Sequence, residues 1–330
     1  MNKKNWIIPG IFVILVFAAV LALITPNNKS IEITENKWPI LRVGYLPIAA
    51  TLPLFVAIEE GYFEEVGIEI KLVRMSSSNE IVNAATADRI DAFIAASNAV
   101  FDAGHVSGKR HLVYAVNPYS DISNHVTDHL IVRKGSGIKT LSELKGRKIA
   151  SFPGSVNRIF TELILQKHGV PVGSYDYIEL LPKDWQPALQ SGTVDAISAL
   201  EPVATQIIND GIGVSIFQGF YADLMPDVPL SAHWISRDFY NRADPKQLSA
   251  FLNTFEKAIK FSRKNEAKKY LVKYANVRED ILEDVNLNDW KGLSEIDTKT
   301  FQDYIDILAD NGALQAKVDI LDYVLKDPRV

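Results

Sequence analysis

The sequence predicts an α/β protein with two lobes, each built on a mostly parallel sheet that is flanked by helices. Short apolar runs with the two-residue period of strands alternate along the chain with stretches of helical period. This order of elements occurs twice, with similar spacing and similar residues at the turns. The length of 330 residues is about twice that of an average domain, so each copy can form a lobe of its own.

The first copy begins at residue 41 with a short apolar run. A helical pattern follows and stops at Gly67, a residue type that commonly ends a helix. Ser77 and Glu80 have the spacing of a capping box, which predicts that the next helix begins there. The second apolar run, residues 68–73, alternates apolar with charged residues, as is typical of a strand with one face in solvent. The expected strands are 41–45, 68–73 and 90–95.

The second copy repeats this order from residue 148 onward. Gly154 opens a helix that stops at Gly169, as the earlier helix stops at Gly67. The Asp-Ala pair that begins at Asp91 returns at Asp195 with nearly equal spacing. Right-handed crossovers through helices join the parallel strands of such units. The expected strands are 149–152, 177–181 and 194–199, with a helix at 185–190.

The chain is expected to cross between the lobes twice. Two such crossings form a hinge, so we expect the lobes to open and close by bending at about 117–130 and 227–235. Further strands are expected at 112–116, 130–133 and 230–235, and further helices at 245–274 and 299–325. Lobe 1 is predicted to comprise 39–120 and 231–330, and lobe 2 to comprise 121–230.

The N-terminal segment has the features of a hydrophobic helix that precedes the lobes. Lys3 and Lys4 come before the uncharged and largely apolar stretch 6–24, which approaches the roughly 20 residues that a membrane span needs. No convincing small-residue cleavage site follows it, which favours an uncleaved signal anchor at 1–29 over a cleaved signal peptide. The positive-inside rule then places the lobes outside the cytoplasm. They are anchored by 6–25 through a tether at 30–38, or exported if the segment is cleaved.

Composition excludes several classes of function. The chain has no cysteine, so it can form no disulfide, no cysteine-ligated metal centre, no thiol nucleophile and no lipid-modified cysteine. Its net charge of -5 comes without long runs of one sign, which argues against nucleic-acid binding. The sequence contains no common catalytic or nucleotide-binding motif. His125 and His129 are four residues apart but lead into a strand, so we predict no metal, cofactor or catalytic residue.

The candidate ligand site follows from the expected topology. In open α/β sheets, ligands bind beyond the carboxyl ends of strands, where helix N-termini offer free N–H groups. Small polar residues occupy these positions; the alternative is that the serines only cap helices. The candidates are Thr51, Ser76, Ser77, Ser97 and Asn98 in lobe 1, and Gly154, Ser155, Arg158 and Glu201 in lobe 2, with Asn124 in the crossing segment.

A series of short motifs in order resembles one family of transport proteins. The residues are Leu41 to Pro47, Glu60 to Phe63, Gly67-Ile68, Ser76 to Ser78, Arg89 to Ala92, Gly154-Ser155, Gly192 to Ala196 and Glu201-Pro202. They are similar to the substrate-binding proteins of ABC importers for nitrate, sulfonates, taurine and thiamine-precursor pyrimidines, the NMT1-like family. The resemblance implies a type II periplasmic-binding-protein fold. It also implies a monomer that captures a small molecule between its lobes and delivers it to a permease and its ATPase.

The resemblance also bears on the ligand. Leu200 stands where relatives usually carry an aromatic residue, and Trp185 of the neighbouring helix is a candidate to replace it. Arg158 is the only cationic residue near the nominated loops, which favours a monoanion over a dianion. A carboxylate at Glu201 that faces the ligand would need a hydrogen-bond donor or a cation on the ligand. An amino-sulfonate or an aminopyrimidine is therefore expected rather than bare nitrate.

Two other functions remain as alternatives. The same superfamily includes enzymes of pyrimidine and cofactor biosynthesis, but the missing cysteines remove the cysteine-rich motif of the fungal pyrimidine synthase. A membrane-anchored ligand sensor is the other alternative. The sequence up to Val330 carries no recognisable output domain, so a sensor is less expected than a transport component.

Overall fold

The computed structural model describes residues 38–120, 122 and 125–330. The predicted anchor at 1–29, all but the last residue of the predicted tether, and Asn124 lie outside the described residues. Among the described residues, no helix combines the length and the apolarity that crossing a membrane requires.

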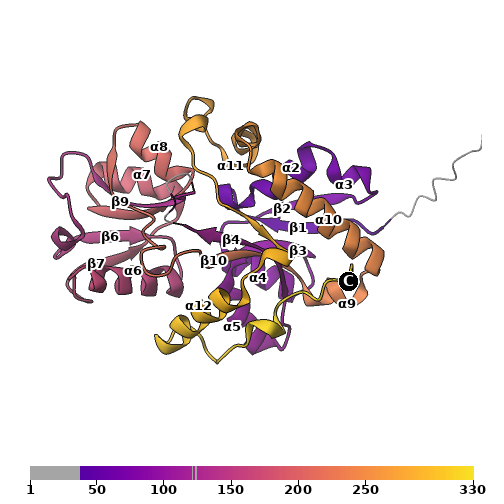
Figure 1. The fold of residues 1–330 in the computed structure, drawn as a ribbon. Coiled ribbons are helices and arrows are strands. Elements are labelled where there is room, and N and C mark those ends of the chain that lie inside the picture. The colour runs from indigo at the N-terminus through magenta and orange to yellow at the C-terminus, as the bar shows by residue number, and fades with distance from the viewer. Residues whose placement is uncertain (1–37, 121, 123–124) are drawn as a thin grey trace, which may run out of the picture. The chain divides into compact units, whose positions relative to one another are not determined.

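Two sheets, each flanked by helices, form the described part of the chain (Figure 1). The first sheet has six strands in the order β11-β4-β10-β3-β1-β2, and the second has five in the order β7-β6-β8-β5-β9. The α/β class and the two lobes are therefore confirmed. The strands of the first sheet are β1 (Leu41–Tyr45), β2 (Ile70–Arg74), β3 (Ala92–Ala96), β4 (Leu112–Tyr119), β10 (Val228–Ile235) and β11 (Lys291–Gly292). Those of the second are β5 (Asp128–Arg133), β6 (Lys148–Ser151), β7 (Asp176–Glu179), β8 (Ala196–Leu200) and β9 (Gly213–Gln218).

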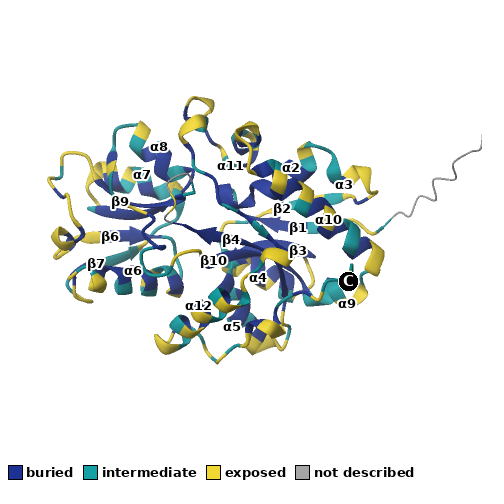
Figure 2. Ribbon diagram, in the orientation of Figure 1, coloured by how far each residue is buried: buried dark blue, intermediate teal, exposed yellow. Residues whose placement is uncertain are grey.

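Helices cover both faces of both sheets (Figure 1). One face of the first sheet carries α2 (Leu52–Glu59), α3 (Tyr62–Glu65), α10 (Pro245–Ser262) and α11 (Lys269–Ala275), and the other carries α4 (Ser78–Thr86), α5 (Ser97–Ser107) and α12 (Thr298–Asp310). In the second sheet, α7 (Pro182–Ser191) and α8 (Val203–Asn209) lie opposite α6 (Ser155–Lys167). The strands β4 and β10 are buried along their whole length, and the other inner strands are largely buried (Figure 2).

The prediction that the sheets are mostly parallel is wrong, because each sheet is mixed. In the first sheet β1 pairs in parallel with β2 and β3, whereas β10 is antiparallel to β3 and β4. In the second sheet β6 pairs in parallel with β7 and β8, whereas β5 is antiparallel to β8 and β9. The physical reason lies in the crossings. β5 and β10 each follow a crossing of the chain from one sheet to the other, so they run opposite to the parallel strands that end on the side of the crossings.

The C-terminal helices are shorter than predicted. The expected helix at 245–274 is divided into α10 and α11, with a short 3-10 helix (Asn265–Lys268) between them. The expected helix at 299–325 ends as α12 at Asp310, because Gly312 adopts a φ of +71° that breaks the helical path. The sequence reading also missed α8 and β9, which follow Glu201.

Equivalent aspartates fasten the two copies of the repeat. Asp91 Oδ2 accepts a hydrogen bond from the backbone N–H of Arg42 at 2.8 Å, and Asp195 Oδ2 accepts one from the backbone N–H of Lys148 at 2.9 Å. In both lobes the aspartate lies just before the third strand of the copy and binds the first strand. The repeated Asp-Ala pair therefore marks equivalent positions in the two lobes.

Candidate functional site

A cleft of about 180 Å³ lies between the lobes, and residues of both lobes line it. Lobe 1 supplies the loop after β1 and the end of β2, and lobe 2 supplies the ends of β6 and β8 and the start of α7. The position beyond the carboxyl ends of strands is the one that the topology rule selects. The lining residues are Leu46, Pro47, Ile48, Arg74, Met75 and Ser76 from lobe 1, and Phe152, Leu181, Pro182, Lys183, Trp185, Leu200, Glu201 and Val203 from lobe 2.

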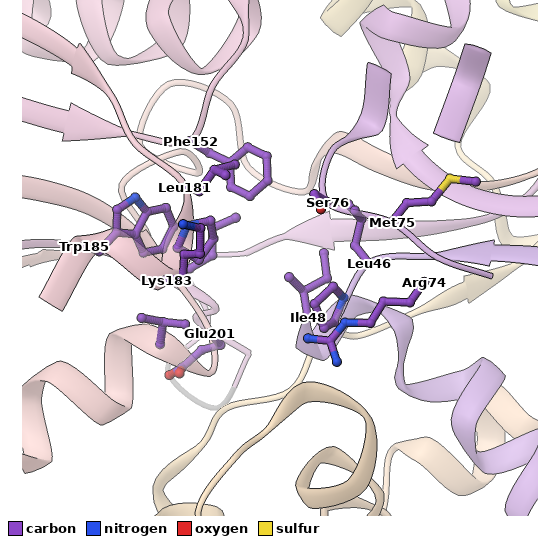
Figure 3. A pocket seen from close by; sticks show the side chains of 14 residues that line it. Leu46, Ile48, Arg74, Met75, Ser76, Phe152, Leu181, Lys183, Trp185 and Glu201 are labelled. Atoms are coloured by element: carbon purple, nitrogen blue, oxygen red, sulfur yellow. The ribbon is translucent and has the colours of Figure 1, made fainter. Parts of the chain in front are cut away.

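Two cationic side chains line the cleft from opposite walls (Figure 3). The Arg74 guanidinium has no ion pair or side-chain hydrogen bond with any described residue. Lys183 Nζ lies 3.4 Å from Asp184 Oδ1, in a pair whose side chains are 74% and 48% exposed, so this contact binds the ammonium only weakly. The cleft therefore presents two cations that are available to an anion.

The sequence reading missed both of these cations. It treated Arg158 as the only positive charge near the site, and that prediction is wrong. Arg158 Nε donates instead to Glu162 Oε1 at 2.9 Å, one turn along the same helix, and its guanidinium lies 5.5 Å from the centre of the Tyr177 ring. Arg74 and Lys183 each stand two residues before a nominated residue. A slightly wider window around each strand end would have found them.

An aromatic pair forms part of the lobe 2 wall. Trp185 is completely buried, and its indole N–H donates to the backbone oxygen of Leu180 at 2.9 Å. Phe152 meets it edge to face, with ring centroids 6.3 Å apart. Because the only polar atom of the indole is already bonded, Trp185 offers the cleft an apolar surface. It remains a candidate for ligand contact at the position the sequence suggested.

Glu201 lines the cleft, but its carboxylate is bound within the protein. The residue is 3% exposed, and its oxygens accept hydrogen bonds from the backbone N–H and the hydroxyl of Thr205, at 3.2 and 2.7 Å. Burial raises the pKa of Glu201 to about 7, because an ionised carboxylate is poorly solvated there. Burial likewise lowers the pKa of His129, whose Nε2 lies 3.8 Å from Glu201 Oε1, to about 4. This engaged carboxylate does not call for a cationic ligand.

Several nominated hydroxyls serve the fold. Ser77 caps α4 by accepting from the Glu80 backbone N–H at 3.2 Å, as the capping box predicts, but the Glu80 carboxylate accepts from the backbone N–H of Ser76 and not from that of Ser77. Thr51 and Ser97 are completely buried and donate to the backbone oxygens of Leu46 and Pro229, at 2.8 and 2.9 Å. For these residues the capping and structural alternative accounts for the hydroxyl. Ser76 differs, because it lines the cleft and its side chain is exposed.

Asn98 and Ser155 meet across the lobes. Asn98 Nδ2 lies 3.4 Å from Ser155 Oγ, which joins the start of α5 to the start of α6. Gly154, just before α6, has a φ of +134°, a value that side-chain-bearing residues rarely adopt. The structure therefore brings Ser76, Trp185 and Glu201 to the cleft and pairs Asn98 with Ser155 beside the crossing. Within the described part of the chain, no group of three or more His, Asp or Glu side chains is arranged to hold a metal.

Comparison with known sequences agrees with the family that the motifs resemble. The sequence model of the NMT1-like family matches residues 35–276. A Bacillus subtilis (strain 168) protein, provisionally named an aliphatic sulfonates-binding protein, is 26% identical over 283 residues, which are 82% of each chain. The nitrate/nitrite binding protein NrtA of Nostoc sp. is 22% identical over 275 residues, or 76% of this chain and 59% of that one. A further relative is an enzyme. The 4-amino-5-hydroxymethyl-2-methylpyrimidine phosphate synthase of Schizosaccharomyces pombe is 22% identical over 216 residues, or 63% of this chain and 60% of that one.

Solved structures share the fold. The alkanesulfonate-binding protein SsuA from Xanthomonas axonopodis pv. citri, bound to MOPS, superposes with a TM-score of 0.72 at 19% identity, covering 88% of this chain and 99% of that one. The periplasmic aliphatic sulphonate binding protein SsuA from Escherichia coli gives a TM-score of 0.71 at 20% identity, covering 88% and 93%. The periplasmic nitrate-binding protein NrtA from Synechocystis PCC 6803 gives 0.69 at 17% identity, covering 87% and 86%. These likenesses identify the two-lobed periplasmic-binding-protein fold.

Proposed function

Because the chain belongs to the NMT1-like family, we propose that it is the solute-binding component of an ABC importer and that its ligand is a small organic anion with an apolar body. An alkanesulfonate is the ligand class that fits the cleft best. The relatives named for sulfonate binding support this choice.

The observation that carries the proposal is the composition of the cleft wall. Arg74 and Lys183 present two cations that the protein does not neutralise, and most of the remaining lining is apolar, including Met75, Phe152 and Trp185. A sulfonate head offers three acceptor oxygens to such cations. Each methylene of its tail that leaves water against the apolar wall contributes about 0.8 kcal/mol. The amino-sulfonate and aminopyrimidine preferred from sequence receive less support, because Glu201 is already bound.

Closure of the lobes is the proposed mechanism of capture. The cations come from different lobes, so only a closed state lets one ligand head reach both. A ligand that binds the closed state better shifts the population toward it. The closed, loaded form would then deliver the ligand to a permease and its ATPase. No covalent chemistry is required.

We further propose that the lobes act outside the cytoplasm as a monomer held near the permease by the segment 6–25. Solved relatives are described as periplasmic binding proteins. The chain has no cysteine that could carry a lipid. An uncleaved hydrophobic segment would then anchor the chain in the membrane in place of a lipid. Fractionation of cells with and without a carbonate wash tests the anchor. Release of the full-length chain by the wash would contradict it.

Calorimetric titration of the full-length chain with a series of sulfonates tests the ligand. We expect hexanesulfonate to bind more tightly than ethanesulfonate, by up to about fourfold per added methylene. Hexanol, which matches the tail but lacks the anion, is expected not to bind. Taurine, nitrate and an aminopyrimidine serve as the competing classes. Tighter binding of any of these than of hexanesulfonate would contradict the proposed ligand.

An enzymatic role is the second candidate function, since one relative is a pyrimidine phosphate synthase. Incubation of the protein with the same ligand panel, followed by mass spectrometry, separates the two. Turnover of an aminopyrimidine without sulfonate binding would favour the enzyme. Recovery of unchanged ligand after saturable sulfonate binding would favour transport.

A further inference from the structure

A short segment of the C-terminal part contacts lobe 2, although the chain on either side of it belongs to the six-stranded lobe. This segment, residues 278–288, lies between α11 and β11 and contains the 3-10 helix Glu279–Asp284. We call it the strap. It runs past α8, the helix that directly follows the cleft residue Glu201.

The outer end of the strap is joined to α8 by an ion pair. Arg278 Nη1 donates to Asp210 Oδ1 at 2.6 Å, and Asp210 terminates α8. The second oxygen of Asp210 accepts from Gln186 Nε2 of α7 at 2.9 Å. Arg278 also binds Asp280 of its own segment, at 3.1 and 3.3 Å, which restricts the orientation of the guanidinium. The strap thus binds an aspartate that two helices of lobe 2 share.

The middle of the strap is held by Asp284. Its Oδ2 accepts from Asn209 Nδ2 at 2.7 Å, and its backbone oxygen lies 3.5 Å from the Thr205 hydroxyl. The same hydroxyl donates to Glu201 Oε1 at 2.7 Å. A chain of contacts therefore leads from the strap through one turn of α8 to the lining of the cleft.

The inner end of the strap reaches the crossing segment directly. Leu287 O lies 3.1 Å from His125 Nδ1, and Asn288 Nδ2 lies 3.3 Å from Thr127 Oγ1. The strap is therefore bonded at its outer end and in its middle to α8 of lobe 2, and at its inner end to the crossing segment and to Pro118 of β4. In the proposed opening of the cleft, α8 moves away from the lobe to which the strap belongs.

We infer that the strap is a non-covalent latch between the lobes and that Asp284 is a positioning residue of the ligand site, acting on it through α8 and Glu201. A latch of this kind favours the closed arrangement before any ligand arrives. Apparent affinity is reduced by the fraction of molecules that are not competent to bind, so weakening the latch lowers the affinity without touching the ligand. The latch rests on the opening and closing of the lobes in the proposed function, but not on which ligand the cleft binds.

The test measures the distance between the lobes without ligand. The absence of cysteine allows spin labels to be placed only where cysteines are introduced, at Asn79→Cys in lobe 1 and Thr193→Cys in lobe 2. We expect Asp284→Ala and Asn209→Ala each to shift the distance distribution toward longer values. The double variant should add little to either, because both changes remove the same contact.

Lys257→Ala provides a matched control. Lys257 Nζ and Glu65 Oε2 form an exposed ion pair of 2.6 Å, the same length as the Arg278–Asp210 pair, but entirely within lobe 1. Its loss is expected to leave the distance unchanged. Arg278→Gln, which removes only the outer contact, serves if an Asp284 variant does not fold.

Unchanged distances in the folded strap variants would overturn the inference. Titration of the same variants with hexanesulfonate separates this inference from the proposed function. Longer distances together with several-fold weaker binding would support both. Longer distances in a protein whose unmodified form does not bind the sulfonate would overturn the ligand proposal and leave the latch standing. Unchanged distances in variants of a protein that binds the sulfonate tightly would overturn the latch and leave the ligand proposal standing.

Discussion

The two walls of the cleft differ in how firmly the protein holds them. On the lobe 2 wall, Trp185 and Glu201 are buried, and hydrogen bonds to Leu180 and Thr205 fix their orientation. On the lobe 1 wall, Arg74 and Ser76 are exposed, and the Arg74 guanidinium is unpaired among the described residues. The difference indicates a division of roles. In the proposed function, lobe 2 offers the apolar body a wall of buried side chains, and the exposed cations Arg74 and Lys183 meet the anion from the two lobes.

The largest expected effect comes from removing the buried Trp185 side chain of the lobe 2 wall. Trp185→Ala removes a completely buried indole, which should lower the free energy of unfolding by about 4 kcal/mol and abolish sulfonate binding. Met75→Ala, on the half-buried lobe 1 side, should cost much less stability. Chemical denaturation of both variants checks the comparison. Equal losses of unfolding free energy in Trp185→Ala and Met75→Ala would contradict the proposed difference between the two walls.

The second prediction concerns the buried acid of lobe 2. The pKa of Glu201 is raised by burial to about 7, above the value near 4.5 of an unfolded chain, so the folded state binds the proton more tightly. This stabilisation is fully present below about pH 4.5 and is lost as the pH rises through about 7. Relative to Glu201→Gln, the unmodified protein should therefore lose stability on the order of 3 kcal/mol between pH 4 and pH 8.

Two neighbouring groups provide comparisons for that pH profile. Asp128, also buried and with its pKa raised to about 7, should give an Asp128→Asn difference of the same sign. His129 has a pKa lowered to about 4, so its contribution has the opposite sign and rises between pH 4 and 6.5. Lys268 and Thr205 also face Glu201 and are left unchanged. A flat difference between Glu201→Gln and the unmodified protein would mean that the carboxyl is not desolvated.

The third prediction compares the repeated aspartates. Asp91 is nearly buried and also binds the side chains of Arg42 and Arg242, whereas Asp195 is more exposed and has Arg147 only at 3.7 Å. Asp91→Ala should cost about 3 kcal/mol of unfolding free energy, because it removes a buried carboxylate that binds the Arg42 backbone and two arginine side chains, which then keep only the exposed Asp88 as an acidic partner. Asp195→Ala should cost about 1 kcal/mol. Thermal unfolding of the pair measures the difference, and equal values would contradict it.

The smallest expected effect is on ligand affinity and comes from removing either of the two exposed cations. Arg74→Ala and Lys183→Ala should each weaken hexanesulfonate binding about tenfold, or about 1.4 kcal/mol, with little loss of stability because both side chains are largely exposed. Arg158→Ala is the matched control and should leave binding unchanged, since its guanidinium is paired with Glu162. Weaker binding of hexanesulfonate by Arg158→Ala would instead place the anion site at the start of α6, where Arg158 lies.

The sequence allowed the repeat, the strand order within each copy and the family to be predicted, because these depend on local patterns. The direction of β5 and β10 could not be predicted, since it depends on where the chain crosses from one sheet to the other. Glu201 lines the cleft, but its bonds to Thr205 depend on α8, which the pattern did not reveal. Arg74 was overlooked because it is the last residue of a strand, whereas candidates were sought only among the residues that follow each strand.

The central claim is that the cleft holds an anion between Arg74 and Lys183, with its apolar body against the lobe 2 wall. Diffraction from crystals of the full-length chain with hexanesulfonate tests it through the anomalous signal of sulfur. With no cysteine and three methionines in the chain, the sulfonate sulfur is easily distinguished. The account predicts a sulfur peak between the two cations and density for the tail beside Trp185 and Phe152. A peak elsewhere, or an empty cleft in crystals grown at saturating sulfonate, would contradict it.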